Sequence, residues 1–275
     1  MLFLTQFLRF TPEALREFLA KLFGTLWYIF AKGRREVIRE NLLAVLGEAK
    51  EEDVKEVFIN FMRVYGDILN IPNMSERYVK SMIKVPELYI LKKELEKSRG
   101  LILVSCHLGG MELAGIFLSS LGFPLYSVAE TRGPGMSFFN FYKRYRTKFG
   151  NKLLSLESKN LTFKLIKLLK ENKIVVLIGD RDILNTGVPT KFFGRIVSIP
   201  KGIVLLSRIT KAPILVGFLA LNKFGSPRYI GKIFPPIYPE EFCSPLEMLD
   251  VLVKNLEEAI KMYPLQWFVF QRIWK

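Results

Sequence analysis

The segment LILVSCHLGGMELAG, residues 101–115, constrains the fold of this chain more than any other. A continuous apolar run of strand length is followed by His107, Gly109 and Gly110, after which apolar residues recur with helical spacing. This pattern predicts a strand, a tight turn and a helix. In open α/β sheets, ligands bind beyond the carboxyl ends of the strands. We therefore expect His107, the single histidine among 275 residues, at the mouth of such a crevice.

Further strand-like runs alternate with helical stretches from Gly100 onward. The predicted strands read LILVSC, PLYSVA, KLLSL, IVVLIGD, PILVGFLAL, RYIGKIF and WFVFQRIW. Helices are expected at 137–149, 161–171, 202–209 and 245–262. The alternation predicts an α/β fold with a mixed, mostly covered central sheet, flanking helices and an N-terminal helical extension.

The N-terminal region has its own helical pattern. Thr11 is the expected N-cap and Pro12 the expected first helical residue. Basic residues interrupt the apolar stripe, and the uncharged stretch is shorter than the roughly 20 residues that span a bilayer. Two interpretations stand side by side, a core-packing helix and a helix in the membrane interface, and Trp27 and Tyr28 before a basic cluster favour the second. We expect residues 1–35 to form this interfacial helix and 36–275 one domain with a helical front end at 36–99.

Composition limits the partners of the chain. Forty-one Lys and Arg against 26 Asp and Glu give a formal net charge of +15, which predicts an acidic partner such as nucleic acid, anionic lipid or an acidic carrier. No nucleic-acid-binding module is recognisable, so a nucleic acid is not expected. Two unpaired cysteines and one histidine fit no common zinc site, and neither a dinucleotide fingerprint nor a P-loop occurs. We expect no metal and no cofactor.

The chemistry around His107 points to a general base. Cys106 and His107 are adjacent on a strand, so their side chains should face opposite sides, which disfavours a nucleophile–base pair. Glu112 follows five residues after His107, and a turn at Gly109 and Gly110 would bring its carboxylate to the imidazole. One ring nitrogen would then be fixed by Glu112, and the other would take a proton from a hydroxyl group.

Four segments together carry a family resemblance. They read RREVIRENLLAVLG, RGLILVSCHLGGMELAG, GDRDILNTGVPTKFFGRIVSIPKG and YPLQWFVFQRIW. The chain resembles the lipid A biosynthesis acyltransferases (lauroyl and myristoyl transferases), a branch of the glycerophospholipid acyltransferase superfamily that also contains phosphatidylinositol mannoside acyltransferases. The resemblance runs nearly end to end and implies a glycerophospholipid acyltransferase-like fold.

The resemblance implies transfer of a fatty acyl group from an acyl carrier protein or coenzyme A thioester to a lipid hydroxyl. His107 and Glu112 match the HxxxxE pair of the family, which implies direct attack by the acceptor with His107 as general base and Glu112 as its partner. Arg132 and Arg146 match arginines near the second family motif, with Arg144 as a nearby substitute, and are implied to bind phosphate or the oxyanion.

The resemblance extends to a downstream motif. Asp180 and Asp182 match a family Asp-Gln-Asp sequence in which Arg181 here replaces glutamine. Phe193 and Gly194 match the FFG segment and are implied to line an acyl channel, although a turn in the core would show the same residues. The family more often has Asn-Trp-Glu where this chain has residues 110–112, which implies a different acceptor pocket.

Several alternatives remain at this stage. The acceptor is a lipid A precursor, a phosphatidylinositol mannoside or a glycerophospholipid; in other classes, the chain is a thioesterase or a basic nucleic-acid-binding protein. The leading interpretation places a peripheral or monotopic enzyme on the cytoplasmic face of the inner membrane, in contact with its anionic surface.

Overall fold

The computed structural model describes residues 11–130, 143, 145–223 and 225–274. Its α-helices are α2 Glu13–Phe30, α3 Lys32–Leu46, α4 Glu51–Asn70, α5 Glu76–Met82, α6 Leu88–Glu96, α7 Met111–Ser120, α9 Leu161–Lys170, α10 Gly202–Thr210 and α11 Pro245–Met262. Its strands are β1 Ile83–Lys84, β2 Leu101–Ser105, β3 Leu125–Ala129, β4 Lys152–Ser155, β5 Ile174–Ile178, β6 Val188–Phe192, β7 Arg195–Ile199, β8 Ile214–Leu221 and β9 Tyr229–Ile233.

A central sheet organises the chain. Its seven strands run in the order β1-β9-β8-β2-β5-β3-β4, and β6 and β7 form a separate antiparallel hairpin. Strand β2 pairs in parallel with β5 and β8, and β3 pairs in parallel with β4 and β5. Strand β9 is antiparallel to β8. The predicted mixed α/β fold is therefore confirmed, and β2 lies in the middle of the sheet with its carboxyl end beside that of β5.

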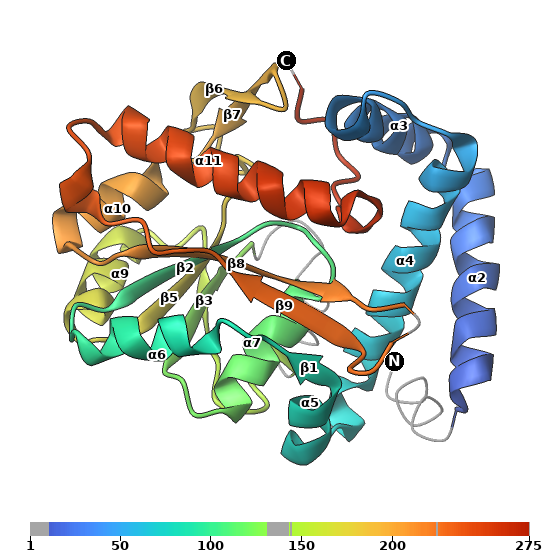
Figure 1. Cartoon of the computed structure of the whole chain (residues 1–275), viewed down its shortest axis with the longest axis horizontal. Coiled ribbons are helices and arrows are strands. Elements are labelled where there is room, and N and C mark those ends of the chain that lie inside the picture. The colour runs from blue at the N-terminus through green and yellow to red at the C-terminus, as the bar shows by residue number, and fades with distance from the viewer. Residues whose placement is uncertain (1–10, 131–142, 144, 224, 275) are drawn as a thin grey trace.

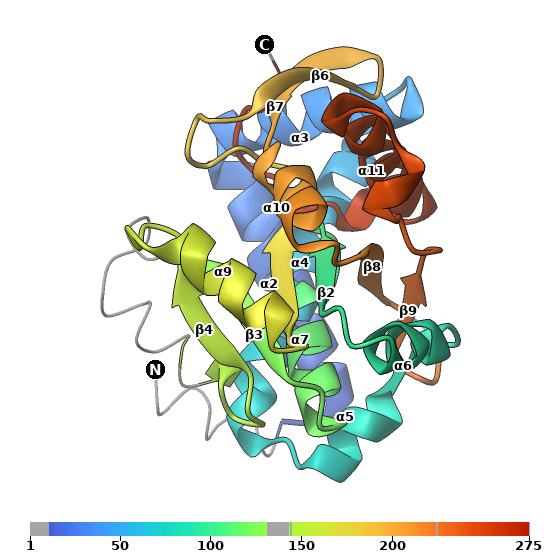
Figure 2. The ribbon, with the colours of Figure 1, turned by 90° about the vertical axis from the view of Figure 1, so that its left-hand side faces the viewer.

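Helices cover both faces of this sheet (Figures 1 and 2). One buried apolar cluster joins a sheet face to α9, α10 and α11, and a second joins the other face to α4, α5, α6 and α7. Successive β2 residues alternate between the two clusters: Ile102 and Val104 belong to the first, Leu101 and Leu103 to the second. Because both faces are covered, β2 is apolar throughout instead of alternating with polar residues.

The N-terminal helices form a layer beside the sheet, where α2 runs along α4 (Figure 1). Small residues make this contact: Ala20 and Gly24 are the buried residues of α2, and a Cβ on Gly24 would lie 2.7 Å from the Ile59 Cα. Pro12, not Thr11, takes the N-cap position. Trp27, expected at a membrane interface, packs on Phe58 with ring centroids 4.8 Å apart, so it belongs to the helix contact.

Two expectations from the sequence were wrong. The run WFVFQRIW is not a strand, because the short 3-10 turn Pro264–Gln266 precedes it and only isolated bridges, Leu108 with Trp267 and Val197 with Trp274, join it to other segments. The second concerns the hairpin β6–β7. The sequence analysis assigned its residues to the FFG motif only and predicted no strands there. The helix expected at 137–149 lies mostly outside the described residues.

Candidate active site

The turn after β2 is shaped by close backbone contacts. Gly109 has φ +51°, and a Cβ there would lie 2.3 Å from the Leu219 carbonyl oxygen. A Cβ on Gly110 would lie 2.8 Å from the Tyr229 ring. Both positions therefore exclude larger residues. The His107 carbonyl accepts a hydrogen bond from the Phe268 amide at 2.7 Å, which fixes the turn that carries the histidine.

Asp180 holds the His107 imidazole. His107 Nδ1 lies 2.8 Å from Asp180 Oδ1, and Asp180 Oδ2 accepts hydrogen bonds from the His107 amide and Trp267 Nε1, both at 2.9 Å. The carboxyl ends of the paired strands β2 and β5 bring these residues together. Burial opposes the charge on Asp180, but the adjacent imidazole and the hydrogen bonds from His107 and Trp267 outweigh it and keep the pKa of this carboxyl below its ordinary value.

This arrangement corrects the expected partner of the imidazole. Among the described residues, no hydrogen bond joins Glu112 to His107, because Glu112 lies in the first turn of α7 and its carboxylate pairs with Arg146. His107 and Glu112 nevertheless line one cavity of about 300 Å³, together with Arg146 and Arg181. Nε2 of His107 has no hydrogen-bond partner in the described part of the chain, which leaves it free to accept a proton.

The other expected site residues divide between the cavity, the core and undescribed segments. Arg132 and Arg144 lie outside the described residues. Asp182 accepts hydrogen bonds from the Gly187 amide at 2.8 Å and Ser198 Oγ at 2.7 Å. Burial opposes the charge on Asp182, but these bonds outweigh it and lower the pKa of the carboxyl. Asp182 thus fixes the loop that leads into β6.

Phe193 and Gly194 form the turn of the β6–β7 hairpin, with φ +49° and +74°. The Phe193 amide donates a hydrogen bond to Glu257, and the Phe193 ring centroid lies 6.0 Å from that of Trp267. Neither residue is among those that line the apolar cavity described next. Their packing instead supports Trp267, which in turn holds Asp180.

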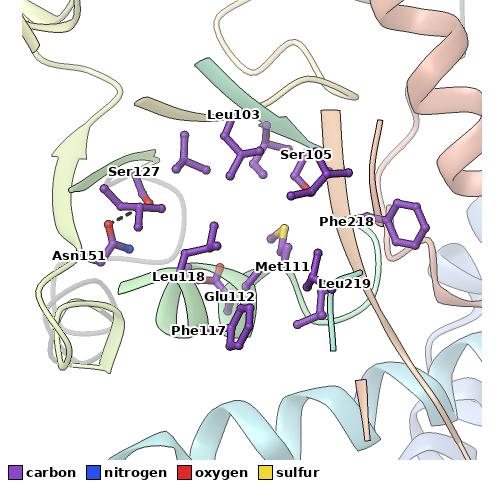
Figure 3. Close-up of a pocket in the computed structure, with 18 of the residues that line it drawn as sticks. Leu103, Ser105, Met111, Glu112, Phe117, Leu118, Ser127, Asn151, Phe218 and Leu219 are labelled. Atoms are coloured by element: carbon purple, nitrogen blue, oxygen red, sulfur yellow. Dashed lines mark hydrogen bonds between the residues drawn. The ribbon is translucent and has the colours of Figure 1, made fainter. Parts of the chain in front are cut away.

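An apolar cavity of about 100 Å³ lies between the sheet and α7 (Figure 3). Leu103, Leu118 and Phe117 contribute to its wall, and Ser127 donates a hydrogen bond to Asn151 Oδ1 at 3.1 Å at one side. Met111, Glu112 and Arg146 line both this cavity and the one that contains His107. The two cavities therefore lie side by side and share these three wall residues.

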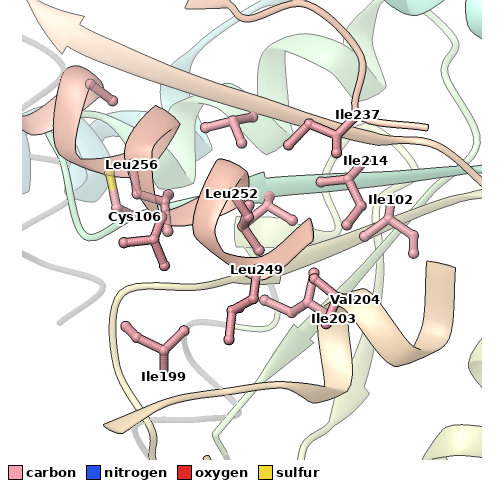
Figure 4. Close-up of a cluster of buried hydrophobic side chains, with 14 of the residues drawn as sticks. Ile102, Cys106, Ile199, Ile203, Val204, Ile214, Ile237, Leu249, Leu252 and Leu256 are labelled. Carbon is pink, nitrogen blue, oxygen red and sulfur yellow. The ribbon is translucent and has the colours of Figure 1, made fainter. Parts of the chain in front are cut away.

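Cys106 is completely buried on the opposite side of the sheet from this cavity, in the cluster that contains Ile199 and Leu256 (Figure 4). Burial, reinforced by the nearby Asp180 charge, raises the pKa of the Cys106 thiol well above its ordinary value. A thiolate nucleophile is thus disfavoured. The described residues also contain no group of three or more His, Cys, Asp or Glu side chains arranged to hold a metal ion.

We expect Cys106→Ala to retain activity within a few fold of the wild type, because the side chain contacts apolar residues and not the cavity. Alanine is preferred to serine here, since serine would bury a hydroxyl group among apolar neighbours. Steady-state kinetics and mass spectrometry of the protein after incubation with acyl donor are the measurements. An acyl adduct on Cys106 would contradict direct attack by the acceptor.

Comparison with known proteins identifies the family of the chain. All of residues 1–275 match the family described as bacterial lipid A biosynthesis acyltransferases. The chain is 24% identical over 253 residues to the phosphatidylinositol mannoside acyltransferase of Mycolicibacterium smegmatis, covering 90% of this chain and 82% of that protein. It is 26% identical over 258 residues to the protein of the same name from Mycobacterium tuberculosis strain CDC 1551, covering 90% and 79%.

Among solved structures, the 1-acyl-sn-glycerophosphate acyltransferase PlsC of Thermotoga maritima aligns with TM-score 0.41 and 19% identity, covering 90% of this chain and 98% of that one. The enzyme is an acyltransferase, of the O-acyltransferase class expected from the sequence. The chain belongs to the bacterial lipid A biosynthesis acyltransferase family.

The sequence analysis did not predict that Asp180 holds the imidazole or that Trp267 holds Asp180. One signal was present: IVVLIGD ends in an acidic residue, as LILVSC ends beside the histidine. Parallel neighbouring strands bring such ends together. Asp180 was missed because sequence alone does not show which strands are neighbours. Trp267 was missed because its segment was predicted to be a strand.

Proposed function

We propose that the enzyme transfers a fatty acyl chain from an acyl carrier protein or coenzyme A thioester to a hydroxyl group of a membrane glycolipid. The observation that carries this proposal is the His107–Asp180 pair at a cavity that shares wall residues with an adjoining apolar cavity. An imidazole with one nitrogen held by a buried carboxylate and the other free is a positioned general base.

The reaction proceeds by direct attack. Nε2 of His107 takes the proton of the acceptor hydroxyl as its oxygen bonds to the thioester carbonyl carbon. When the carbon–sulfur bond breaks, the proton passes from the imidazolium to the departing thiolate, so no acyl-enzyme forms. Asp180 stays ionised and stabilises the imidazolium. Glu112 holds the Arg146 guanidinium at the cavity, where its charge stabilises the oxyanion or a phosphate of the donor.

In this proposal the apolar cavity under α7 receives the first carbons of the donor acyl chain. Met111 and Glu112 line both this cavity and the one that contains His107, which supports a thioester carbon beside the base and a chain directed into the interior. Arg181 lines the outer cavity and donates a hydrogen bond to Gln271, so it borders the space for the acceptor head group. Arg181 stands where the family usually has glutamine, which favours an altered set of acceptor contacts.

Three acceptor classes remain. A lipid A precursor is the acceptor in the family description, whereas a phosphatidylinositol mannoside is favoured by the names of the curated relatives. A glycerophospholipid is the third candidate. Incubation with labelled acyl-CoA or acyl carrier protein and total polar lipids, followed by mass spectrometry, tests the proposal. Absence of any acylated lipid with either donor, or transfer that persists in His107→Ala, would overturn it.

The outer face of α2 contacts the membrane in this proposal. Small residues face α4, while Phe18, Leu22 and Ile29 are exposed, with Phe18 at 59%. Lys32 and Arg34 lie just beyond the helix and favour an anionic surface. No helix in the described residues combines the length and apolarity needed to cross a bilayer. We infer a peripheral or monotopic position on the cytoplasmic face of the inner membrane.

We expect the triple change Phe18→Gln, Leu22→Gln and Ile29→Gln to reduce flotation with anionic liposomes while the enzyme remains folded, because all three side chains are exposed. Added salt should weaken the remaining binding. Phe163→Gln on α9 is the matched control, since this phenylalanine is also exposed but lies on another helix. Equal flotation of the triple variant and the wild type would place the membrane contact elsewhere.

A further inference from the structure

A second large space lies beside α2, separate from the outer face just described. It is a groove of about 730 Å³ between α2 and α4, within the size range of ligand sites. Phe23, Leu26 and Phe30 of α2 and Met62 and Tyr65 of α4 contribute apolar walls. Phe23, Leu26 and Phe30 are exposed to solvent, Phe30 at 79%. Contiguous apolar surface of this kind marks a binding site.

The groove adjoins the active site through Tyr65. This residue lines the groove and also a small cavity of about 90 Å³ that contains His107, Met111 and Glu112. Its ring stacks on Phe61 with centroids 5.7 Å apart and an interplanar angle of 11°. Tyr65 therefore stands between the groove and the small cavity that contains the imidazole.

The charges of the groove select its occupant. Five basic residues, Arg16, Lys21, Arg63, Lys223 and Arg228, line it against three acidic ones, Glu13, Glu17 and Asp67. Arg63, Arg228 and Lys21 form ion pairs with these acids, and Lys223 pairs with Glu56. Arg16 Nε, by contrast, is buried and has no hydrogen-bond partner among the described residues. A second copy of this chain, with a net charge of +15, would be repelled, and an anionic lipid would be attracted.

We propose that the groove between α2 and α4 takes the acyl tails of an anionic lipid acceptor from the membrane and directs its hydroxyl group past Tyr65 to His107. This inference rests on the proposed function. The acceptor then reaches His107 from the α4 side, while the donor acyl chain occupies the cavity under α7. Two separate apolar sites allow both lipid chains to be bound during one transfer.

Gly66 provides a specific test. It lines the groove, and a Cβ added there meets no heavy atom within 4 Å, so a larger side chain would extend into open groove space. Gly66→Trp should lower the rate of acyl transfer to polar lipids by about tenfold or more. A tenfold loss corresponds to about two methylene groups of the acceptor tail that are no longer buried. Gly66→Ala, the matched control, should stay near the wild type.

A photolabelling experiment measures whether lipid occupies the groove, independently of catalysis. Phosphatidylcholine vesicles that contain phosphatidylglycerol with a diazirine at the tail end are irradiated with enzyme, and adducts are mapped by mass spectrometry. We expect adducts at Phe23, Met62 or Tyr65 in the wild type and Gly66→Ala, and at least a tenfold loss in Gly66→Trp. Adducts confined to Phe18, Leu22 and Ile29, or groove adducts unchanged in Gly66→Trp, would overturn the proposal.

The outcomes separate the two proposals. Groove labelling that appears only after deletion of residues 2–10 would show that this segment occupies the groove, and would also overturn the inference. Normal groove labelling without acyl transfer in any protein would contradict the proposed function alone. Acyl transfer equal in the wild type and Gly66→Trp would contradict the groove as an acceptor route and leave the catalytic proposal standing.

Discussion

His107→Ala should lower kcat/KM for acyl transfer by about 10² to 10⁴-fold, the usual contribution of a general base. The expectation follows from Nε2 at the cavity, which has no hydrogen-bond partner among the described residues, and from the absence of any second histidine in the sequence. The fold should persist, because Asp180 keeps two donors, the amide of residue 107 and Trp267 Nε1. Thermal unfolding and circular dichroism check that the variant is folded.

His107→Asn is a second variant for the same question. An amide can donate a hydrogen bond to Asp180 but cannot take a proton from a hydroxyl group, so the activity should be as low as in His107→Ala. Wild-type activity in either folded variant would contradict general-base catalysis by His107.

Asp180→Asn should lower kcat/KM by about 10² to 10⁴-fold as well, with Asp180 acting as a positioning residue. An amide donor facing Nδ1 favours the tautomer with the proton on Nε2, which can no longer accept one. Trp267 Nε1 can still donate to the amide oxygen, so packing is largely preserved. Kinetics of both single variants and the double variant are the measurement.

The double variant separates positioning from a purely structural effect. His107→Ala combined with Asp180→Asn should cost little more activity than His107→Ala alone, because the two residues act as one unit. Losses that multiply would show that Asp180 acts apart from the imidazole. Glu112→Gln is the matched carboxylate-to-amide change, and we expect it to couple with Arg146→Ala through the ion pair between these residues.

The location of His107 was accessible from sequence because it depends on local features. The apolar run at 101–105, the glycines at 109 and 110 and the apolar spacing of 113–117 specify strand, turn and helix, and the structure has these elements at β2 and α7. Most other long apolar runs also became strands, since a buried strand requires a continuous apolar sequence. Local patterning thus identified the α/β class and placed the histidine at a strand end.

The exposed apolar residues of α2 show that one local pattern can have two structural outcomes. The apolar positions of α2 repeat with helical spacing, and sequence alone does not tell which side packs on protein. Contact through Ala20 and Gly24 allows close approach to α4, and this leaves the larger apolar residues outside. Trp27 instead joins an aromatic cluster with Phe58 and Phe270, a contact between residues far apart in sequence.

The sequence by itself determined the strand–turn–helix around His107, the α/β class and the family, because each depends on residues that are neighbours along the chain or on recognisable motifs. Only the tertiary structure decided which carboxylate holds the imidazole. Asp180 is 73 residues from His107, and the parallel pairing of β2 with β5 joins them, while Trp267 comes from a third segment. Strand order depends on the packing of the whole chain, so no local pattern contains it.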